Sequence, residues 1–296
     1  MFFDIIKHMS HRLAIITVVY QNYIILDDFF DSLCKNADVD FQLYIIDLSE
    51  QKKSIIPPSQ LKVQMITGEN KGYAHGVNLG IKKAMQDGIN HFCIVNSDII
   101  FSANFVQNVK QSLSDNPHSI IGGKIYYAPG YEYHKTRYQK SDLGNVIWYA
   151  GGKVDWKNAL TPHRGVDEVD KQQFDKKGET EFVNGCLMCF DKSVVEKVGL
   201  WNENYFLYFE DSDYCERSKR KKIKLFYDPS VVIWHKNSQS TDGSGSKLHQ
   251  QYQRKNQLIF GLKYAPLKTK LHLIYNYCRF IIDNRKLQLS QEPHKS

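Results

Sequence analysis

The chain has 296 residues, of which 42% are hydrophobic and 13% aromatic, a composition that suits one large domain or two closely packed halves and argues against a disordered protein. No apolar run is long enough to cross a bilayer and the first residues lack the pattern of a secretory signal, so we expect a cytoplasmic protein that is soluble or bound to a membrane surface. The formal net charge of +7 lies at one end, because residues 247–296 hold ten Lys and Arg against two Asp and Glu.

Three short runs in the first third of the chain, 13–19, 43–46 and 92–95, are apolar and rich in β-branched residues. Buried parallel strands have this composition. Helical patterns separate the runs, one at 26–33 and one at 77–85. The alternation predicts an α/β fold built on a parallel sheet.

Polar residues follow each of these strands: Tyr20 after the first, Asp47 after the second, and Asn96 and Asp98 after the third. Because the carboxyl ends of parallel strands meet at one edge of an open sheet, we expect a crevice there for a polar ligand such as a nucleotide. No GxGxxG turn follows the first strand, which argues against a dinucleotide-dependent oxidoreductase. The P-loop of nucleoside triphosphatases, GxxxxGK[ST], does not occur either.

The second half begins after a helical pattern at 105–113. Residues 126–181 show weak periodicity and predict long loops that contact substrate. After these loops, the sequence predicts a strand at 182–190, a short helix from 191 to 199, and strands at 223–227 and 231–234. We therefore divide the chain into a nucleotide-sugar-binding half, an acceptor-binding and catalytic half, and a basic tail, with the bounds 1–117, 118–246 and 247–296.

Three carboxylates, Glu210, Asp211 and Asp213, lie within four residues directly behind an aromatic run. The residues that follow suit a short helix with the acids at its N-terminal end, where the helix dipole favours their ionised form. A carboxylate kept charged near apolar side chains can act as a general base or a metal ligand. The alternative is that Asp211 is an N-cap and its neighbours are solvated acids of the first turn.

Apolar residues interleave with Lys and Arg throughout the tail, which is typical of basic amphipathic helices. Two interpretations stay open: the tail lies on anionic lipid, or it is an ordinary helical cap with a solvated basic face. We do not expect nucleic acid as a partner, because the basic residues come without a recognisable nucleic-acid-binding motif.

The motifs together resemble the inverting family-2 glycosyltransferases of the GT-A fold, especially the bacterial branch with rhamnosyltransferases of surface-polysaccharide assembly. The resemblance covers most of residues 12–242 and is carried by NKGYAHGVNLGI at 70–81, NSD at 96–98, NG at 184–185, VGLWNE at 198–203, FEDSD at 209–213, YDP at 227–229 and VIWH at 232–235. It implies a Rossmann-like, mostly parallel central sheet flanked by helices, with the helical tail at the C-terminus.

On the donor side, the resemblance implies a divalent cation, Mg²⁺ or Mn²⁺, which neutralises the charge that builds on the leaving diphosphate. Asp98 matches the implied metal ligand, and His235 matches a family histidine that joins the metal or the diphosphate. The family motif is usually DxD, but Asn96 holds its first position here, so the diphosphate itself is expected to complete the metal shell. Asp47 matches an Asp that binds the nucleotide base. Further donor contacts are implied at Tyr20, Gly72, Asn78 and Asn96. Arg254 and Asn256 resemble a late Arg-x-Asn element of the family, which implies a donor contact at Arg254.

On the acceptor side, Asp211 matches the catalytic base that takes the proton from the attacking hydroxyl. Acceptor contacts are implied at Gly185, Trp201, Glu210 and Asp213, although a core role for Trp201 is an equal alternative. The sequence thus predicts an inverting glycosyltransferase that moves a hexose, rhamnose from dTDP-rhamnose, to a lipid-linked glycan acceptor of bacterial O-antigen or capsule synthesis at the inner face of the membrane. The alternatives are a sugar-phosphate nucleotidyltransferase and a non-catalytic carbohydrate-binding protein of the same fold.

Overall fold

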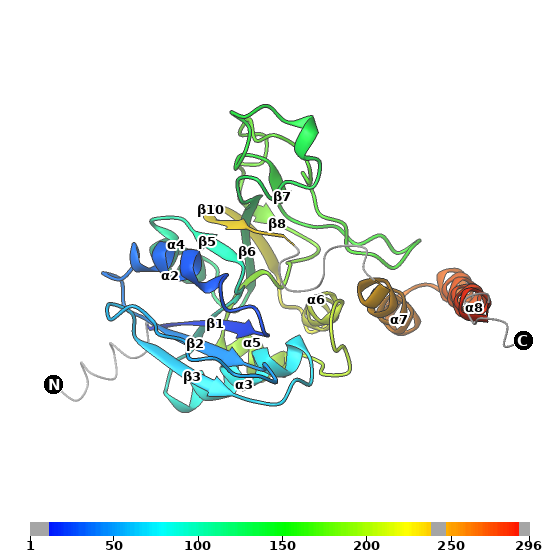
Figure 1. Ribbon diagram of the computed structural model, residues 1–296, viewed down its shortest axis with the longest axis horizontal. Helices are drawn as coiled ribbons and strands as arrows, with labels where there is room; N and C mark the ends of the chain where they lie inside the picture. The colour runs from blue at the N-terminus through cyan, green and yellow to red at the C-terminus, as the bar shows by residue number, and fades with distance from the viewer. Residues whose placement is uncertain (1–11, 238–246, 290–296) are drawn as a thin grey trace, which may run out of the picture.

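One ten-stranded sheet organises the chain (Figure 1). The computed structural model describes residues 12–237 and 247–289, with side chains between 250 and 282 in the second range. The strands are β1 Leu13–Val19, β2 Phe41–Asp47, β3 Val63–Thr67, β4 His91–Asn96, β5 Ile99–Phe101, β6 Ile120–Tyr127, β7 Ile147–Tyr149, β8 Gly178–Glu179, β9 Leu187–Asp191 and β10 Leu225–His235. The helices are α2 Leu26–Cys34, α3 Tyr73–Gln86, α4 Phe105–Asp115, α5 Lys192–Val198, α6 Glu210–Arg220, α7 Lys247–Tyr264 and α8 Leu267–Leu289, with a 3₁₀ turn at Lys135–Arg137.

The predicted parallel strands form the first half of the sheet, in the order β3-β2-β1-β4. Strands β1 and β2 are buried almost throughout, which explains why their sequences are continuously apolar. Val19 pairs with Asp47 and Val18 pairs with Asn96. This register brings the polar strand ends to one edge, as the sequence predicts.

The second half of the sheet is mixed. Strand β9 runs antiparallel to both β4 and β6, and β10 runs parallel to β6 but antiparallel to β5. The two strands predicted at 223–234 are one strand, β10, interrupted by a bulge between Asp228 and Val232. Gly123 faces this bulge, and a Cβ there would lie 2.1 Å from the Val231 carbonyl oxygen, so only glycine fits.

The predicted strand at 182–190 starts only at Leu187. Residues 184–186 form a turn instead, because the Asn184 side chain accepts a hydrogen bond from the Cys186 N–H at 2.7 Å. The two predicted halves nevertheless share one sheet, since β9 joins β4 to β6. This turn therefore lies where the halves meet.

Helices cover the sheet, and the C-terminal helices project from it to one side (Figure 1). Helix α3 packs on β1 and β2, α2 packs against β5, and α4 packs against β10. Residues 128–181 form an insertion above the sheet that carries β7 and β8. Helix α7 lies beside α6, and α8 packs on α7 at the edge of the molecule. Among the described helices, none is long and apolar enough to span a membrane.

Candidate active site

Asp98 and His235 meet at the end of the sheet. Their side chains are buried, and His235 Nε2 lies 3.1 Å from Asp98 Oδ1. The contact follows from the pairing of β10 with β5, in which His235 stands opposite Ile99, the residue after Asp98. The Trp148 ring packs edge-on against the His235 ring, with 4.6 Å between centroids, and fixes its orientation.

The donor set of Asp98 and His235 fits a divalent cation. Neighbouring ligands of an octahedral Mg²⁺ at roughly 2.1 Å stand about 3 Å apart, which is close to the separation of these two atoms. Among the described residues, no group of three or more His, Cys, Asp and Glu side chains converges on a common point. Two protein ligands thus leave several coordination positions for phosphate oxygens or water.

The ends of β1 and β2 form a second polar region. Asp47 is buried, and its carboxylate accepts hydrogen bonds from the Tyr23 hydroxyl at 2.9 Å and the Ser49 N–H at 2.9 Å. The Gln21 N–H donates to Ser49 Oγ at 2.7 Å, and Gln21 has a positive φ of 58°. Tyr20 is half-buried beside them. The structure thus places Asp47, the predicted base-binding residue, and Tyr20, a predicted donor contact, at the same edge.

Gly185 and Cys186 connect the Asp98 region to the acidic helix. The Gly185 N–H donates to Asp211 Oδ2 at 2.9 Å, and the Asn96 N–H donates to the Cys186 carbonyl at 3.2 Å. A Cβ on residue 185 would lie 3.3 Å from both the Asp211 Cβ and the Trp201 ring, so glycine allows this close approach. Two successive residues therefore hold Asn96 on one side and Asp211 on the other.

The electrostatics of the neighbouring side chains agree with this proximity. Burial raises the pKa of the Cys186 thiol, and the charges of Asp98 and Asp211 raise it further. Burial also raises the pKa of the Tyr73 hydroxyl well above its ordinary value, with contributions from Cys186, Glu210, Asp211 and Asp98. Tyr73 donates to the Gly185 carbonyl at 3.2 Å. The predicted metal ligand and the predicted base thus act on the same two side chains.

Glu210 and Asp211 begin helix α6 but differ in their surroundings. Burial raises the pKa of the Asp211 carboxyl, and hydrogen bonds from the N–H groups of Gly185 and Ser212 partly offset that rise. Burial, followed by the nearby charge of Asp211, raises the pKa of Glu210 well above its ordinary value. Glu210 Oε2 is buried and has no hydrogen-bond partner within the described part of the chain. Of the two carboxyls, Glu210 therefore holds its proton more strongly, and Asp211 is the one whose charged form receives backbone hydrogen bonds.

Asp213 lies in a different environment. Its carboxylate is fully buried and accepts hydrogen bonds from Arg217 Nε at 2.7 Å, Lys263 Nζ at 2.8 Å and the Tyr264 hydroxyl at 2.7 Å. Because three groups donate to it and it is not exposed, the Asp213 carboxylate is better suited to joining α6 to α7 than to the contact with the sugar acceptor that the sequence analysis expected.

Asn78 and Trp201 contact each other. The Asn78 amide donates to the Trp201 carbonyl at 2.9 Å and to Glu203 Oε1 at 2.7 Å, while its oxygen accepts from the Trp201 N–H at 2.9 Å. Trp201 is 2% exposed and stacks on Tyr214. These contacts favour a structural role for Asn78 and the core alternative for Trp201, in place of the donor and acceptor contacts expected.

Gly72 and Arg254 also have partners other than those expected. Gly72 has φ +101°, and a Cβ there would lie 2.3 Å from the Phe206 carbonyl oxygen, so its glycine is required by the loop before α6. Arg254 is exposed on α7, where its guanidinium lies over the Phe280 ring of α8. Both contacts differ from the donor contacts that the resemblance implies.

His163 is a residue of the site region that the sequence analysis did not single out. Its Nδ1 lies 3.0 Å from the Trp148 carbonyl oxygen and its Nε2 lies 3.1 Å from the Asn184 amide nitrogen. Burial lowers the pKa of His163 to about 4, so the ring is neutral, donates through Nδ1 and accepts through Nε2. The histidine thus orients Asn184 at the start of the Gly185 turn. Its sequence neighbourhood carries no motif that marks it.

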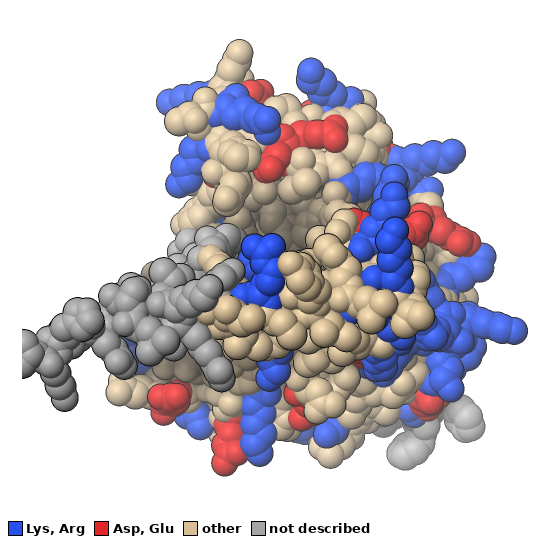
Figure 2. Space-filling view, turned by 90° about the vertical axis from the view of Figure 1, so that its right-hand side faces the viewer, with Lys and Arg blue, Asp and Glu red and all other residues tan. Residues whose placement is uncertain are grey.

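The surface around α7 and the insertion is hollowed (Figure 2). Figure 2 shows the recess between the insertion at the top and the rest of the molecule, with Lys and Arg side chains below and beside it and Asp or Glu side chains at its upper edge. The basic side chains favour anionic ligands, and the acidic ones oppose them.

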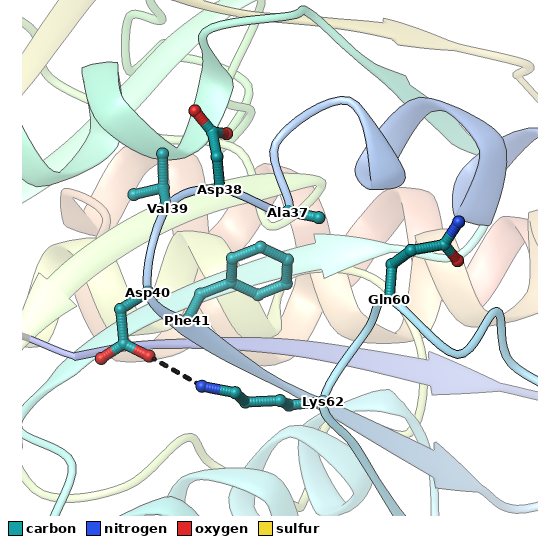
Figure 3. Close-up of a pocket in the computed structure, with 7 residues that line it drawn as sticks. All are labelled: Ala37, Asp38, Val39, Asp40, Phe41, Gln60 and Lys62. Carbon is teal, nitrogen blue, oxygen red and sulfur yellow. Dashed lines mark hydrogen bonds and ion pairs between the residues drawn. The ribbon is translucent and has the colours of Figure 1, made fainter.

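A second hollow lies at the opposite edge of the sheet (Figure 3). Asp40 and Lys62, on its wall, precede β2 and β3 and lie 3.4 Å apart as an ion pair. Its lining consists of Ala37, Asp38, Val39, Asp40, Phe41, Gln60 and Lys62. Because ligands of open α/β sheets bind outside the carboxyl ends of the strands, we do not place the active site here.

The family assignment rests on the match of residues 14–199, more than half of the chain, to the model of glycosyl transferase family 2. The chain belongs to glycosyl transferase family 2. This confirms the family predicted from the motifs.

Two curated relatives of this family-2 chain are similar over part of their length. The low-salt glycan biosynthesis hexosyltransferase Agl10 of Haloferax volcanii is 24% identical over 161 residues, which cover 54% of this chain and 47% of the relative. The dTDP-rhamnosyl transferase RfbF of Shigella flexneri is 22% identical over 177 residues, which cover 59% and 52%. The chain thus spans about half the length of the curated relatives it matches.

The fold of this family-2 chain is similar to that of a solved structure, GalNAc-T7 with UDP, GalNAc and Mn²⁺. The TM-score is 0.60 at 13% identity, and the alignment covers 84% of this chain and 47% of the other. The likeness confirms the predicted GT-A fold.

Stability should report the protonation of Glu210. Because the folded state raises its pKa, the wild type loses stability as pH rises above the unfolded value of about 4.3, where the folded protein still retains the proton. Glu210→Gln cannot lose a proton, so its melting temperature should rise relative to wild type between pH 4 and 8. Thermal unfolding of both proteins across this range measures the difference. A constant difference would contradict the raised pKa.

Proposed function

We propose that the protein is an inverting glycosyltransferase that uses a nucleotide-sugar donor. The observation that carries the proposal is the Gly185–Cys186 turn, which holds Asp211 on one side and the Asp98 strand end on the other. Transfer to a hydroxyl needs a base for the incoming proton and a stabilised leaving diphosphate. Membership of glycosyl transferase family 2 supports the same reaction class.

The proposed reaction is a single displacement. The acceptor oxygen attacks the anomeric carbon, and Asp211 takes the proton of that hydroxyl. The bond between the anomeric carbon and the diphosphate oxygen breaks, and its electron pair leaves with the nucleoside diphosphate. Because the nucleophile enters opposite the leaving group, the configuration inverts. Asp211 suits the base because two backbone N–H groups stabilise its charged form, whereas the raised pKa of Glu210 favours a proton there that can be donated to the acceptor.

Asp98 and His235 would hold the divalent cation, Mg²⁺ or Mn²⁺. When bound, the cation supplies positive charge to the diphosphate oxygens. The donor set and the 3.1 Å separation described above support this assignment. Asn96 is the last residue of β4, at the same edge, where its neutral side chain can contact the diphosphate without adding negative charge.

We further propose that the donor is dTDP-rhamnose, with Asp47 and Tyr20 at its nucleotide base. The support is the rhamnosyltransferase-like motif pattern and the similarity to a relative named as a dTDP-rhamnosyl transferase. The proposed acceptor is a lipid-linked glycan of a bacterial surface polysaccharide, presented at the inner face of the cell membrane.

The outer face of α8 supports the proposal that the protein binds a membrane surface. Its exposed apolar side chains recur at spacings of four and three residues and form one stripe: Leu267, Leu271, Ile274, Tyr275, Ile281 and Ile282. Lys268 and Arg279 flank one side of the stripe and Lys270 the other, as helical spacing places them. No Asp or Glu occurs between residues 247 and 282. Two copies would repel each other at this face, whereas anionic lipid would attract it.

The inner face of α8 packs on the protein. Leu273 is buried against Gly261, and Thr269 donates to the Trp156 carbonyl at 2.8 Å. The helical cap and the proposed lipid-binding surface, which the sequence left as alternatives, would thus be opposite faces of one helix. A truncation before α7 would remove both.

The general base is tested by Asp211→Asn. We expect kcat for transfer from dTDP-rhamnose to fall about 10²–10⁴-fold, because the variant cannot take the proton, while donor binding stays within about threefold. Asp191→Asn is the matched control, since Asp191 likewise accepts from two backbone N–H groups, those of His118 and Ser193, outside the site. Calorimetry and turnover assays measure both constants.

Wild-type turnover by Asp211→Asn would require another base. Glycan binding without any sugar-nucleotide binding by the wild type would instead favour the non-catalytic alternative.

The cation site is tested by Asp98→Asn and His235→Gln. Mn²⁺ should tighten dTDP binding to the wild type, and each variant should reduce that gain about tenfold or more because one ligand is lost. Calorimetric titration of dTDP with Mn²⁺ or with EDTA measures the gain, and His134→Gln, an exposed histidine of the insertion, is the control. An unchanged Mn²⁺ effect in both variants would place the cation elsewhere.

The membrane face is tested by the triple variant Leu271→Ser, Ile274→Ser and Tyr275→Ser. We expect it to bind vesicles containing phosphatidylglycerol at least about fivefold less than wild type, because each apolar side chain contributes burial in the interface. Vesicle flotation measures the bound fraction, and Ile24→Ser with Ile56→Ser controls for loss of exposed apolar surface elsewhere. Equal binding by all three proteins, or a change in oligomeric state alone, would contradict the lipid assignment.

A further inference from the structure

The turn that leads into α6 is strained. Tyr208 and Phe209 both have φ of 70°, and Phe209 is in the left-handed helical region. This conformation is unfavourable for residues other than glycine, because the Cβ atom crowds the following carbonyl oxygen. Two such residues in succession directly precede Glu210 and Asp211, so the strain persists only where surrounding contacts hold it.

One row of α7 supplies these contacts. Tyr252, Asn256, Phe260 and Tyr264 are spaced four residues apart and share one face of the helix. They meet the turn in chain order. Tyr252 stacks on Phe206 with 5.1 Å between centroids, Phe260 packs on Phe209 at 5.5 Å, and Tyr264 donates to Asp213 at 2.7 Å. Figure 1 shows α7 alongside α6.

Asn256 supplies the polar contact in this row. It is 1% exposed, and its amide nitrogen donates to two successive carbonyls, that of Leu207 at 2.8 Å and that of Tyr208 at 3.0 Å. The first carbonyl belongs to the peptide that precedes Tyr208, and the second belongs to the peptide between Tyr208 and Phe209. One buried side chain thus fixes the backbone orientation on entry to the turn.

We propose that Asn256 is a positioning residue that holds the left-handed Tyr208–Phe209 turn and thereby sets the place of Asp211. The inference rests on the proposed role of Asp211 as the base. It replaces the diphosphate contact that the Arg-x-Asn resemblance implies for Asn256. Helix α7 is then part of the support of the active site rather than an appendage.

A role of Asn256 in merely attaching α7 to the protein can be separated from positioning the turn, because other residues also attach α7 to the protein. Gln257 Nε2 donates to the Asn158 carbonyl at 2.8 Å, one residue along the same helix but away from the turn. Gln257→Ala is therefore the matched control for Asn256→Asp, which keeps the shape but removes both N–H donors.

The first readout is hydrogen exchange of the backbone at 205–214, followed by mass spectrometry, which needs no substrate. We expect Asn256→Asp to speed exchange at least about tenfold there, and Gln257→Ala to leave it within twofold of wild type. In the dTDP-rhamnose assay, kcat of Asn256→Asp should fall about tenfold or more with KM for the donor within threefold, since the base and not the donor site is displaced.

A rescue variant gives a second readout. Adding Tyr208→Gly should restore part of kcat, because glycine adopts the left-handed conformation without strain.

Unchanged exchange at 205–214, equal effects of Asn256→Asp and Gln257→Ala, or no rescue by Tyr208→Gly would each overturn the proposal. Faster exchange with no transferase activity in any protein, wild type included, would support the positioning role and refute the proposed reaction alone.

Discussion

The hydrogen bond from the Gly185 N–H to Asp211 sets the geometry of the whole site. It exists because β9 starts late, leaving residues 184–186 as a turn between the central strand β4 and helix α6. Asn96 contacts the next residue, Cys186. A shift of either half of the sheet would therefore separate the acidic helix from the strand end that carries Asp98. The absence of a side chain at Gly185 makes this closeness sterically feasible.

Burying several carboxylates close together is unfavourable, because each loses its hydration and like charges repel. The protein offsets this in a different way for each group. Asp213 is neutralised by Lys263 and Arg217, so it stabilises the fold. Burial and the charge of its neighbour raise the pKa of Glu210 and so favour its neutral form. Two backbone N–H donors stabilise the charged form of Asp211, which stays partly accessible. Three acids within four residues thus have three different environments.

The helical tail connects this chemistry to the surface of the molecule. The α7 row holds the strained turn before α6, and α8 is packed on α7. The outward stripe of α8 is apolar with basic flanks. A lipid surface that engages α8 would accordingly lie next to the helix that supports Asp211, which is consistent with the proposed lipid-linked acceptor.

The sequence by itself determined the parallel strands, the polar strand ends and the family, because strand composition and motif order are local properties. It also predicted Asp98, His235 and Asp211 as a set, and the structure brings them into one region. Only the tertiary structure assigned Asp213, Asn78 and Asn256 to support, since their partners, apart from Arg217 one turn along α6 from Asp213, lie 48 or more residues away along the chain. His163 was missed for the same reason: its neutrality and its contact with Asn184 come from burial, which no local pattern encodes.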